Sequence, residues 1–85
     1  MTNQVEVFSA VQDAIVCVLD LPADEVKMES HIVDDLGAES IDFLDISSEL
    51  EKSLNIEVDF KEIANDNLSN LKVSQVVTYI QKLPN

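Results

Sequence analysis

The residue best suited to chemistry in this chain is Ser40, which lies three positions after Gly37, the only glycine. Acidic residues stand on both sides of it, and an amphipathic helical pattern begins at Ile41. The serine therefore marks the point where a flexible loop becomes a helix, and we expect its hydroxyl to be exposed. A phosphate ester at this place would meet the positive end of the helix dipole and unpaired backbone N–H groups. This combination favours a serine that is covalently modified over one that catalyses.

Two other roles for Ser40 remain open on the residues alone. Serine is a preferred N-cap, so Ser40 could simply begin a helix. Alternatively, His31 and an aspartate could join it in a hydrolase triad, which requires a base within hydrogen-bond reach and an oxyanion hole. Nothing in the sequence marks an oxyanion hole, so we expect no enzyme here and interpret His31 as a polar loop residue.

The charge of the chain is its strongest compositional feature. Seventeen acidic residues face five lysines and no arginine, and the formal net charge is −12. Phosphate contacts need Lys or Arg, so nucleic acid and anionic membrane surfaces are excluded as ligands. A partner enzyme with a basic patch is the natural complement, although a merely solvated acidic surface is the alternative. The cluster of Asp34, Asp35 and Glu39 lacks the alternating ligands and central glycine of an EF-hand, so we expect no metal site.

The length fits one domain over residues 1–85, and an apolar share of 46% fits a folded core. No apolar run approaches the length of a membrane span, so no membrane insertion is expected. Cys17, the only cysteine, excludes an internal disulfide, and its apolar neighbours predict that it is buried. The N-terminus has no secretory leader, which predicts a cytoplasmic location. The length and the start at Met1 indicate a free-standing protein, which we expect to be a monomer.

Helical periodicity accounts for most of the chain. The first helix is predicted from Thr2 or Asn3 to Leu19, with Thr2 as a candidate cap, and Pro22 excludes its continuation. The connection that follows, residues 20–39, is too long for a simple turn and must be pinned by its own apolar residues. Those residues are Leu21, Val26, Met28, Ile32, Val33 and Leu36.

The second helix is predicted from Ser40 or Ile41 to Leu54. Its apolar face is assigned to Ile41, Leu44, Leu50 and Leu54 with Phe43 and Ile46, and its polar face to Asp42, Asp45, Glu49 and Lys52. An extended link, residues 55–58, leads to a capping box at Asp59 and a short helix from Phe60 to Ala64 or Asn65. After a polar loop, a last helix covers Lys72 to Lys82, and Pro84 ends it. The expected fold is all-α: a small four-helix bundle, three main helices plus one short helix, with a long loop between helices one and two.

The run Asp35-Leu36-Gly37-Ala38-Glu39-Ser40-Ile41-Asp42 resembles the attachment motif of acyl carrier proteins, usually written D-L-G-[AG]-D-S-[LI]-D. Glu39 stands where Asp is commoner, and Ile41 where Leu is commoner. The later part of the second helix, the extended link and the last helix are also similar to this family, so the resemblance covers nearly the whole chain.

The resemblance implies that Ser40 receives 4′-phosphopantetheine from coenzyme A through a phosphopantetheinyl transferase, which uses a divalent metal. The thiol of that arm would then carry an acyl chain as a thioester to acyl-transferring and chain-modifying enzymes. The family's docking surface is helix two. Carried over to this chain, docking falls on Glu39, Asp42, Asp45, Glu49 and Glu51. The acyl chain itself could fold back between the helices if the thin core opens, and the candidate linings on helices two and three are then Phe43, Leu44 and Ile63.

The chain departs from the family pattern at a few positions. Ser47 and Ser48 stand where two apolar residues are usual, Lys52 where the pattern is acidic, and Phe43 where a smaller residue is usual. These changes leave two pathways open, fatty-acid synthesis or a specialised lipid or secondary-metabolite pathway. A second hypothesis is an unmodified acidic regulatory protein that docks on a basic enzyme surface through its second helix.

Overall fold

The computed structural model describes residues 3–64 and 67–83. In this part of the chain the helices are α1 (Gln4–Leu19), α2 (Ser40–Leu54), α3 (Phe60–Ala64) and α4 (Val73–Lys82). Two 3₁₀ turns, η1 (Ala23–Glu25) and η2 (Leu68–Asn70), lie in the connections. The described residues contain no strand, only an isolated bridge between His31 and Lys72. The all-α four-helix prediction is confirmed.

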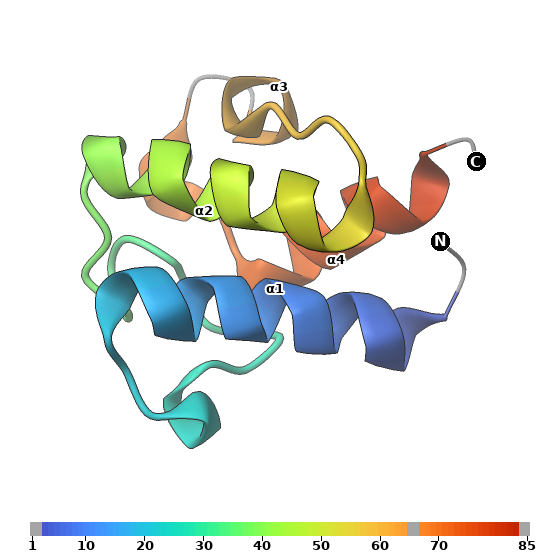
Figure 1. Ribbon diagram of the computed structural model, residues 1–85. Helices are drawn as coiled ribbons and strands as arrows, with labels where there is room; N and C mark the ends of the chain where they lie inside the picture. The colour runs from blue at the N-terminus through green and yellow to red at the C-terminus, as the bar shows by residue number, and fades with distance from the viewer. Residues whose placement is uncertain (1–2, 65–66, 84–85) are drawn as a thin grey trace.

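The three longer helices pack around one core. Figure 1 shows α1 and α2 side by side and running in opposite directions, with α4 behind them and the short α3 above α2. The core is built from the inward stripes of these helices together with residues of the long loop. Its fully buried side chains include Val11, Ile15, Ile32, Ile46, Leu50, Leu71, Val76 and Ile80.

The start and end of α1 follow local rules. The side chain of Asn3 accepts hydrogen bonds from the N–H groups of Val5 (2.9 Å) and Glu6 (3.4 Å), so Asn3 is the N-cap. Asp20 adopts a left-handed conformation with φ 56° and ends the helix before Pro22. The alternative cap, Thr2, lies outside the described residues, as do Asn65 and Pro84.

Cys17 is exposed, so its predicted burial is wrong. The buried stripe of α1 is Val7, Val11, Ala14 and Ile15. Cys17 lies two residues beyond Ile15, which turns it about 200° around the helix axis and away from the core.

The loop of residues 20–39 is pinned by its apolar side chains, as predicted. Val26, Ile32 and Leu36 are buried, and Leu21, Met28 and Val33 pack against the core. The loop is also bonded to the start of α4, because Ile32 N donates to Leu71 O (3.0 Å) and Val73 N donates to Ser30 O (3.0 Å). These bonds fix the segment that leads directly to Ser40.

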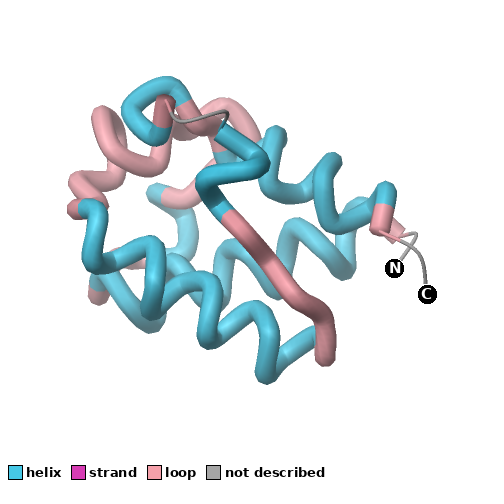
Figure 2. The backbone as a smooth tube through the Cα atoms, turned by 90° about the horizontal axis from the view of Figure 1, so that it is seen from above, coloured by secondary structure: helices cyan, strands magenta, loops and turns pink. Residues whose placement is uncertain are grey.

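The link between α2 and α3 is extended and crosses back over the bundle, as the tube of Figure 2 shows. Asn55, with φ 56°, ends α2 and redirects the chain. Asp59 then caps α3, since its Oδ1 accepts from the N–H groups of Lys61 (3.0 Å) and Glu62 (3.4 Å). Asp59 is therefore confirmed as the cap, whereas the other half of the predicted capping box, a bond from the Asp59 N–H to the Glu62 side chain, is not found in the described residues.

Candidate functional site

Ser40 is the first residue of α2, and the N-cap is Glu39, so the interpretation of Ser40 as an N-cap is wrong. The Ser40 side chain is exposed. Its hydroxyl makes no hydrogen bond within residues 3–64 and 67–83. The oxygen is therefore open to an enzyme that approaches from solvent, and the first backbone N–H groups of α2 lie beside it.

The residues around Ser40 fix the start of α2 without using the serine. Asp42 Oδ2 accepts a hydrogen bond from Glu39 N (2.8 Å), and Asp42 N donates to Glu39 O (2.9 Å). Gly37 has φ +78°, a region that glycine enters at little cost. A Cβ on Gly37 would meet nothing within 4 Å, so backbone conformation and not space requires glycine there. The turn, the buried Ala38 and the Asp42 cap together hold Ser40 outward.

Two large apolar residues next to Ser40 point to solvent. Ile41 is 65% exposed and Leu44 is 70% exposed, so their assignment to the buried face was wrong. The true inward stripe of α2 is Phe43, Ile46 and Leu50, with Leu54 packed against the core beyond it. The spacing of that stripe was the signal that would have excluded Ile41 and Leu44 from the core, because both fall well away from it around the helix.

The acidic residues of α2 lie in different environments. Glu39 and Asp45 are exposed, whereas Asp42, Glu49 and Glu51 are half-buried. Glu49 Oε2 lies 3.9 Å from the exposed Nζ of Lys52, a weak ion pair that water screens. One end of α2 therefore combines the exposed hydroxyl of Ser40, the apolar patch of Ile41 and Leu44, and the exposed carboxylate of Asp45.

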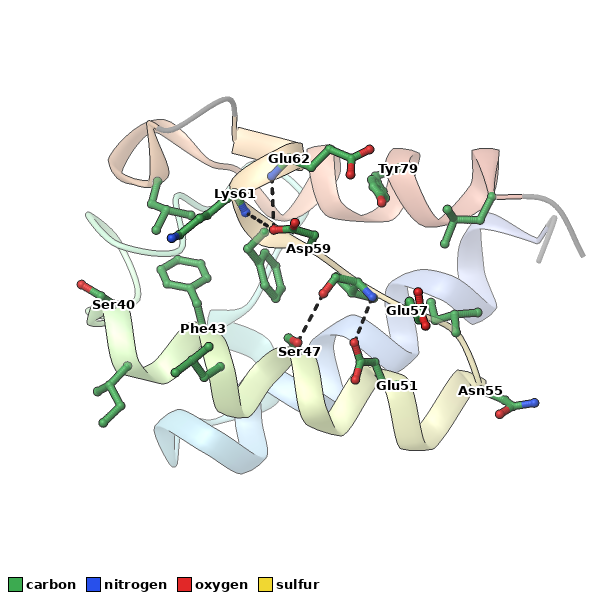
Figure 3. Close-up of a pocket in the computed structure, with 17 residues that line it drawn as sticks. Ser40, Phe43, Ser47, Glu51, Asn55, Glu57, Asp59, Lys61, Glu62 and Tyr79 are labelled. Atoms are coloured by element: carbon green, nitrogen blue, oxygen red, sulfur yellow. Dashed lines mark hydrogen bonds between the residues drawn. The ribbon is translucent and has the colours of Figure 1, made fainter.

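A groove of about 1180 Å³ begins at Ser40 and follows α2 toward Asn55 (Figure 3). Its walls come from α2, the link, α3 and the outer part of α4. Phe43 and Leu44 line it, whereas Ile63 packs against the core and does not line it. The remaining lining residues are Ile41, Ser47, Glu51, Ile56, Glu57, Val58, Asp59, Phe60, Lys61, Glu62, Leu68, Tyr79 and Leu83.

Two side chains of α2 hold the link through a single residue. Ser47 Oγ donates to the carbonyl oxygen of Val58 (3.4 Å), and Glu51 Oε2 accepts from the N–H of the same residue (3.1 Å). Figure 3 shows both bonds as dashed lines that run from α2 to the link. We call Ser47, Glu51 and Val58 the link clamp. No local pattern in the sequence predicts the link clamp, because it joins residues 7 and 11 positions apart across the turn at the end of α2.

The titrating groups near the site are shifted by identifiable causes. Partial burial raises the pKa of Tyr79 above its ordinary value, and the charges of Glu62 and Asp59 raise it further. The pKa of Asp35 is lowered, chiefly because its carboxylate accepts from His31 N (2.8 Å) and lies 3.3 Å from His31 Nδ1. The ring of His31 is thus bonded to Asp35 within the loop. No group of three or more potential ligands in the described ranges is placed to hold a metal ion.

Comparison with known proteins gives one consistent result. Residues 9–72 match the family described as "Phosphopantetheine attachment site". The chain is 39% identical over 78 residues to an acyl carrier protein of Campylobacter hominis, covering 92% of this chain and 94% of that protein. It is 40% identical over 75 residues to an acyl carrier protein of Clostridium acetobutylicum, covering 88% and 92%. The chain belongs to the acyl carrier protein family.

Membership fits the structure around α2. Acyl carrier proteins take 4′-phosphopantetheine as their covalent cofactor, and the matched family is defined by that attachment. The exposed hydroxyl at a helix N-terminus suits a phosphodiester, since the helix dipole and free N–H groups favour negative charge there. None of the helices in the described part of the chain has the length and hydrophobicity needed to cross a bilayer.

Proposed function

We propose that this acyl carrier protein bears 4′-phosphopantetheine on Ser40 and carries acyl groups as thioesters on the thiol of that arm. The observation that supports this most strongly is the free, exposed Ser40 hydroxyl at the first position of α2, within a chain whose family is defined by phosphopantetheine attachment. In this proposal the protein presents cargo and catalyses nothing itself.

The attachment step uses Ser40 as the nucleophile. Its Oγ attacks the phosphorus that links pantetheine to the nucleotide in coenzyme A, and a new P–O bond to serine forms. The pyrophosphate P–O bond breaks, adenosine 3′,5′-bisphosphate leaves with the electron pair, and the transferase accepts the hydroxyl proton. The N-terminal dipole of α2 stabilises the negative phosphodiester that results. Once attached, the arm supplies a thiol for thioester formation.

Docking is the second element of the proposal. The exposed end of α2 offers Ile41 and Leu44 as an apolar patch beside the carboxylates of Glu39 and Asp45. A transferase or acyl-handling enzyme with an apolar pocket rimmed by basic residues would complement this surface. Rim charges of this kind raise the association rate more than the affinity, which suits a protein that must leave each enzyme quickly.

The other acidic residues assigned to docking are placed less favourably. Asp42 is bonded to the Glu39 backbone, and Glu49 lies beside Lys52. Glu51 serves the link clamp and lines the groove. We therefore propose that Asp45 and Glu39 dominate recognition, with Asp42 and Glu49 at the margin.

We also propose that the pathway is a specialised lipid or secondary-metabolite pathway of the cytoplasm. The support is the character of the groove, in which Ser47 and several carboxylates stand along the path open to cargo. These polar groups interrupt an otherwise largely apolar lining, so the groove stabilises a long saturated chain less than a wholly apolar one would.

Intact-mass measurement after incubation with coenzyme A and a phosphopantetheinyl transferase tests this function. The wild-type chain should gain the mass of one phosphopantetheine, and Ser40→Ala should gain none. Ser48→Ala is the matched control, because Ser48 is another exposed serine of α2 and should not affect the gain. Equal modification of Ser40→Ala and wild type would contradict the proposal, and no gain with several transferases would favour an unmodified regulatory protein.

A further inference from the structure

The floor of the groove beside Ser40 is formed by two aromatic rings, Phe43 from α2 and Phe60 from α3. We propose that the Phe43–Phe60 pair closes the interior of the bundle to the acyl cargo. A chain tethered at Ser40 then lies along the groove in contact with water and does not enter the core between α2 and α3. This inference rests on the proposed attachment at Ser40.

The two rings fill the space between the elements they join. Their centroids are 5.2 Å apart and their planes meet at 62°, an edge-to-face arrangement that is favourable beyond simple burial. Phe43 is 4% exposed and Phe60 is 5% exposed, so only a small part of each residue is accessible from the groove. Fully buried core residues such as Ile46 occupy the interior. In a packed interior of this kind, an entering chain must displace a ring.

The link clamp closes the next possible entrance along α2. Moving the link away from α2 would break the bonds of Ser47 and Glu51 to Val58 together. The move would also bring the Val58 side chain, now only 6% exposed, into water, which is costly. The rings and the clamp thus block adjacent stretches of the same wall.

The open part of the groove changes character along its length. Ile41 and Leu44 provide an apolar rim near Ser40. Further along, the carboxylates of Glu57, Asp59 and Glu62 alternate with apolar side chains such as Ile56 and Leu83. A short acyl group is covered by the apolar rim, whereas a longer chain lies on this mixed lining in contact with water.

The wild-type protein tests this inference directly. It is loaded from butanoyl-, hexanoyl-, octanoyl- and decanoyl-coenzyme A by a promiscuous phosphopantetheinyl transferase, and intact mass verifies each product. Melting temperature is then measured for every form. A buried methylene would raise Tm by about 3–6 °C in a domain of this size. We expect Tm to stay level from hexanoyl to decanoyl, and the thioesters to react with hydroxylamine at one common rate.

Variants that remove a ring provide the second arm. Phe43→Ala should open the floor of the groove to the interior, so Tm should rise with acyl-chain length. The Tm of each acyl form is compared with that of the same variant carrying the unloaded arm. Phe60→Leu is the milder variant in case Phe43→Ala fails to fold. Phe8→Leu is the matched control, since Phe8 packs on the core from α1 but does not line the groove, and it should keep the level profile.

The outcomes separate the two proposals. A chain that accepts no acyl-phosphopantetheine contradicts the attachment at Ser40 itself. If the loaded wild-type chain shows a Tm that rises with each added pair of carbons, and its thioester becomes protected from hydroxylamine, the cargo enters the core. That result overturns the role proposed for Phe43 and Phe60 and leaves the attachment at Ser40 intact. The proposed role of the two rings is also overturned if Phe43→Ala and Phe60→Leu show a Tm that is as independent of acyl-chain length as that of Phe8→Leu.

Discussion

Glu51 is assigned two different roles by the family resemblance and by the structure, and one substitution separates them. The resemblance places Glu51 in the docking surface, whereas its carboxylate accepts the N–H of Val58 at 3.1 Å. Glu51→Ala leaves that N–H without a partner in a residue that is 6% exposed. We therefore expect a stability defect and little change in docking.

The magnitude follows from the burial of the bond. An unsatisfied buried donor costs about 1–3 kcal/mol, and Glu51 is only half-buried, so about 1–2 kcal/mol is expected. In a domain of this size such a loss lowers Tm by about 4–16 °C. Glu51→Gln keeps an acceptor oxygen and should lose less than half of that. Ser47→Ala removes the longer, 3.4 Å bond and should cost about 0.5 kcal/mol.

The assay is thermal and urea denaturation of the unloaded protein, followed by the rate of arm transfer at a temperature where all variants are folded. Glu49→Ala is the control, because Glu49 is a half-buried acid of the same helix whose nearest charged partner is the exposed Lys52. If Glu51→Ala and Glu49→Ala melt at the same temperature, the link clamp contributes nothing to stability, which contradicts the structural role assigned to Glu51. A slower transfer without lower stability would return Glu51 to the docking surface.

Three further predictions concern charge. Asp45→Lys should slow arm transfer several-fold through lost electrostatic steering and leave Tm unchanged, and unaltered transfer kinetics would remove Asp45 from the interface. With a net charge of −12, the folded state is destabilised by repulsion between its own charges, so added salt or a millimolar divalent cation should raise Tm. A Tm that does not change with ionic strength would show that this repulsion is unimportant. Burial and the charges of Glu62 and Asp59 raise the pKa of Tyr79 in the folded state, so unfolding should release its proton more readily. Stability should therefore fall as pH rises above about 10, and Tyr79→Phe should reduce that fall; identical pH profiles would argue against the shift.

The sequence predicted the parts of this fold that depend on local rules. Periodicity located α1, α2 and α4 to within a residue or two, the proline at position 22 gave the end of α1, and the cap at Asp59 gave the start of α3. Gly37, the only glycine, lies in the loop before Ser40 and adopts φ +78°. These features are set by neighbours in sequence, so the sequence reports them.

Features that depend on packing were missed or misassigned. Ile41 and Leu44 were placed in the core because they are apolar, yet the inward stripe of α2 holds Phe43 and Ile46 and leaves both exposed. Cys17 was misplaced for the same reason. The link clamp and the contact of Phe43 with Phe60 arise only after the link and α3 are folded against α2.

The proposed attachment point is one oxygen atom, the Oγ of Ser40, and mass spectrometry that localises the modification is its most direct test. The protein is co-expressed with a phosphopantetheinyl transferase, digested, and fragmented so that the modified residue is identified. We expect phosphopantetheine on Ser40 and on no other residue. Phosphopantetheine on Ser47 or Ser48, or a fully unmodified Ser40 in cells that contain an active phosphopantetheinyl transferase, would contradict the proposed attachment at Ser40.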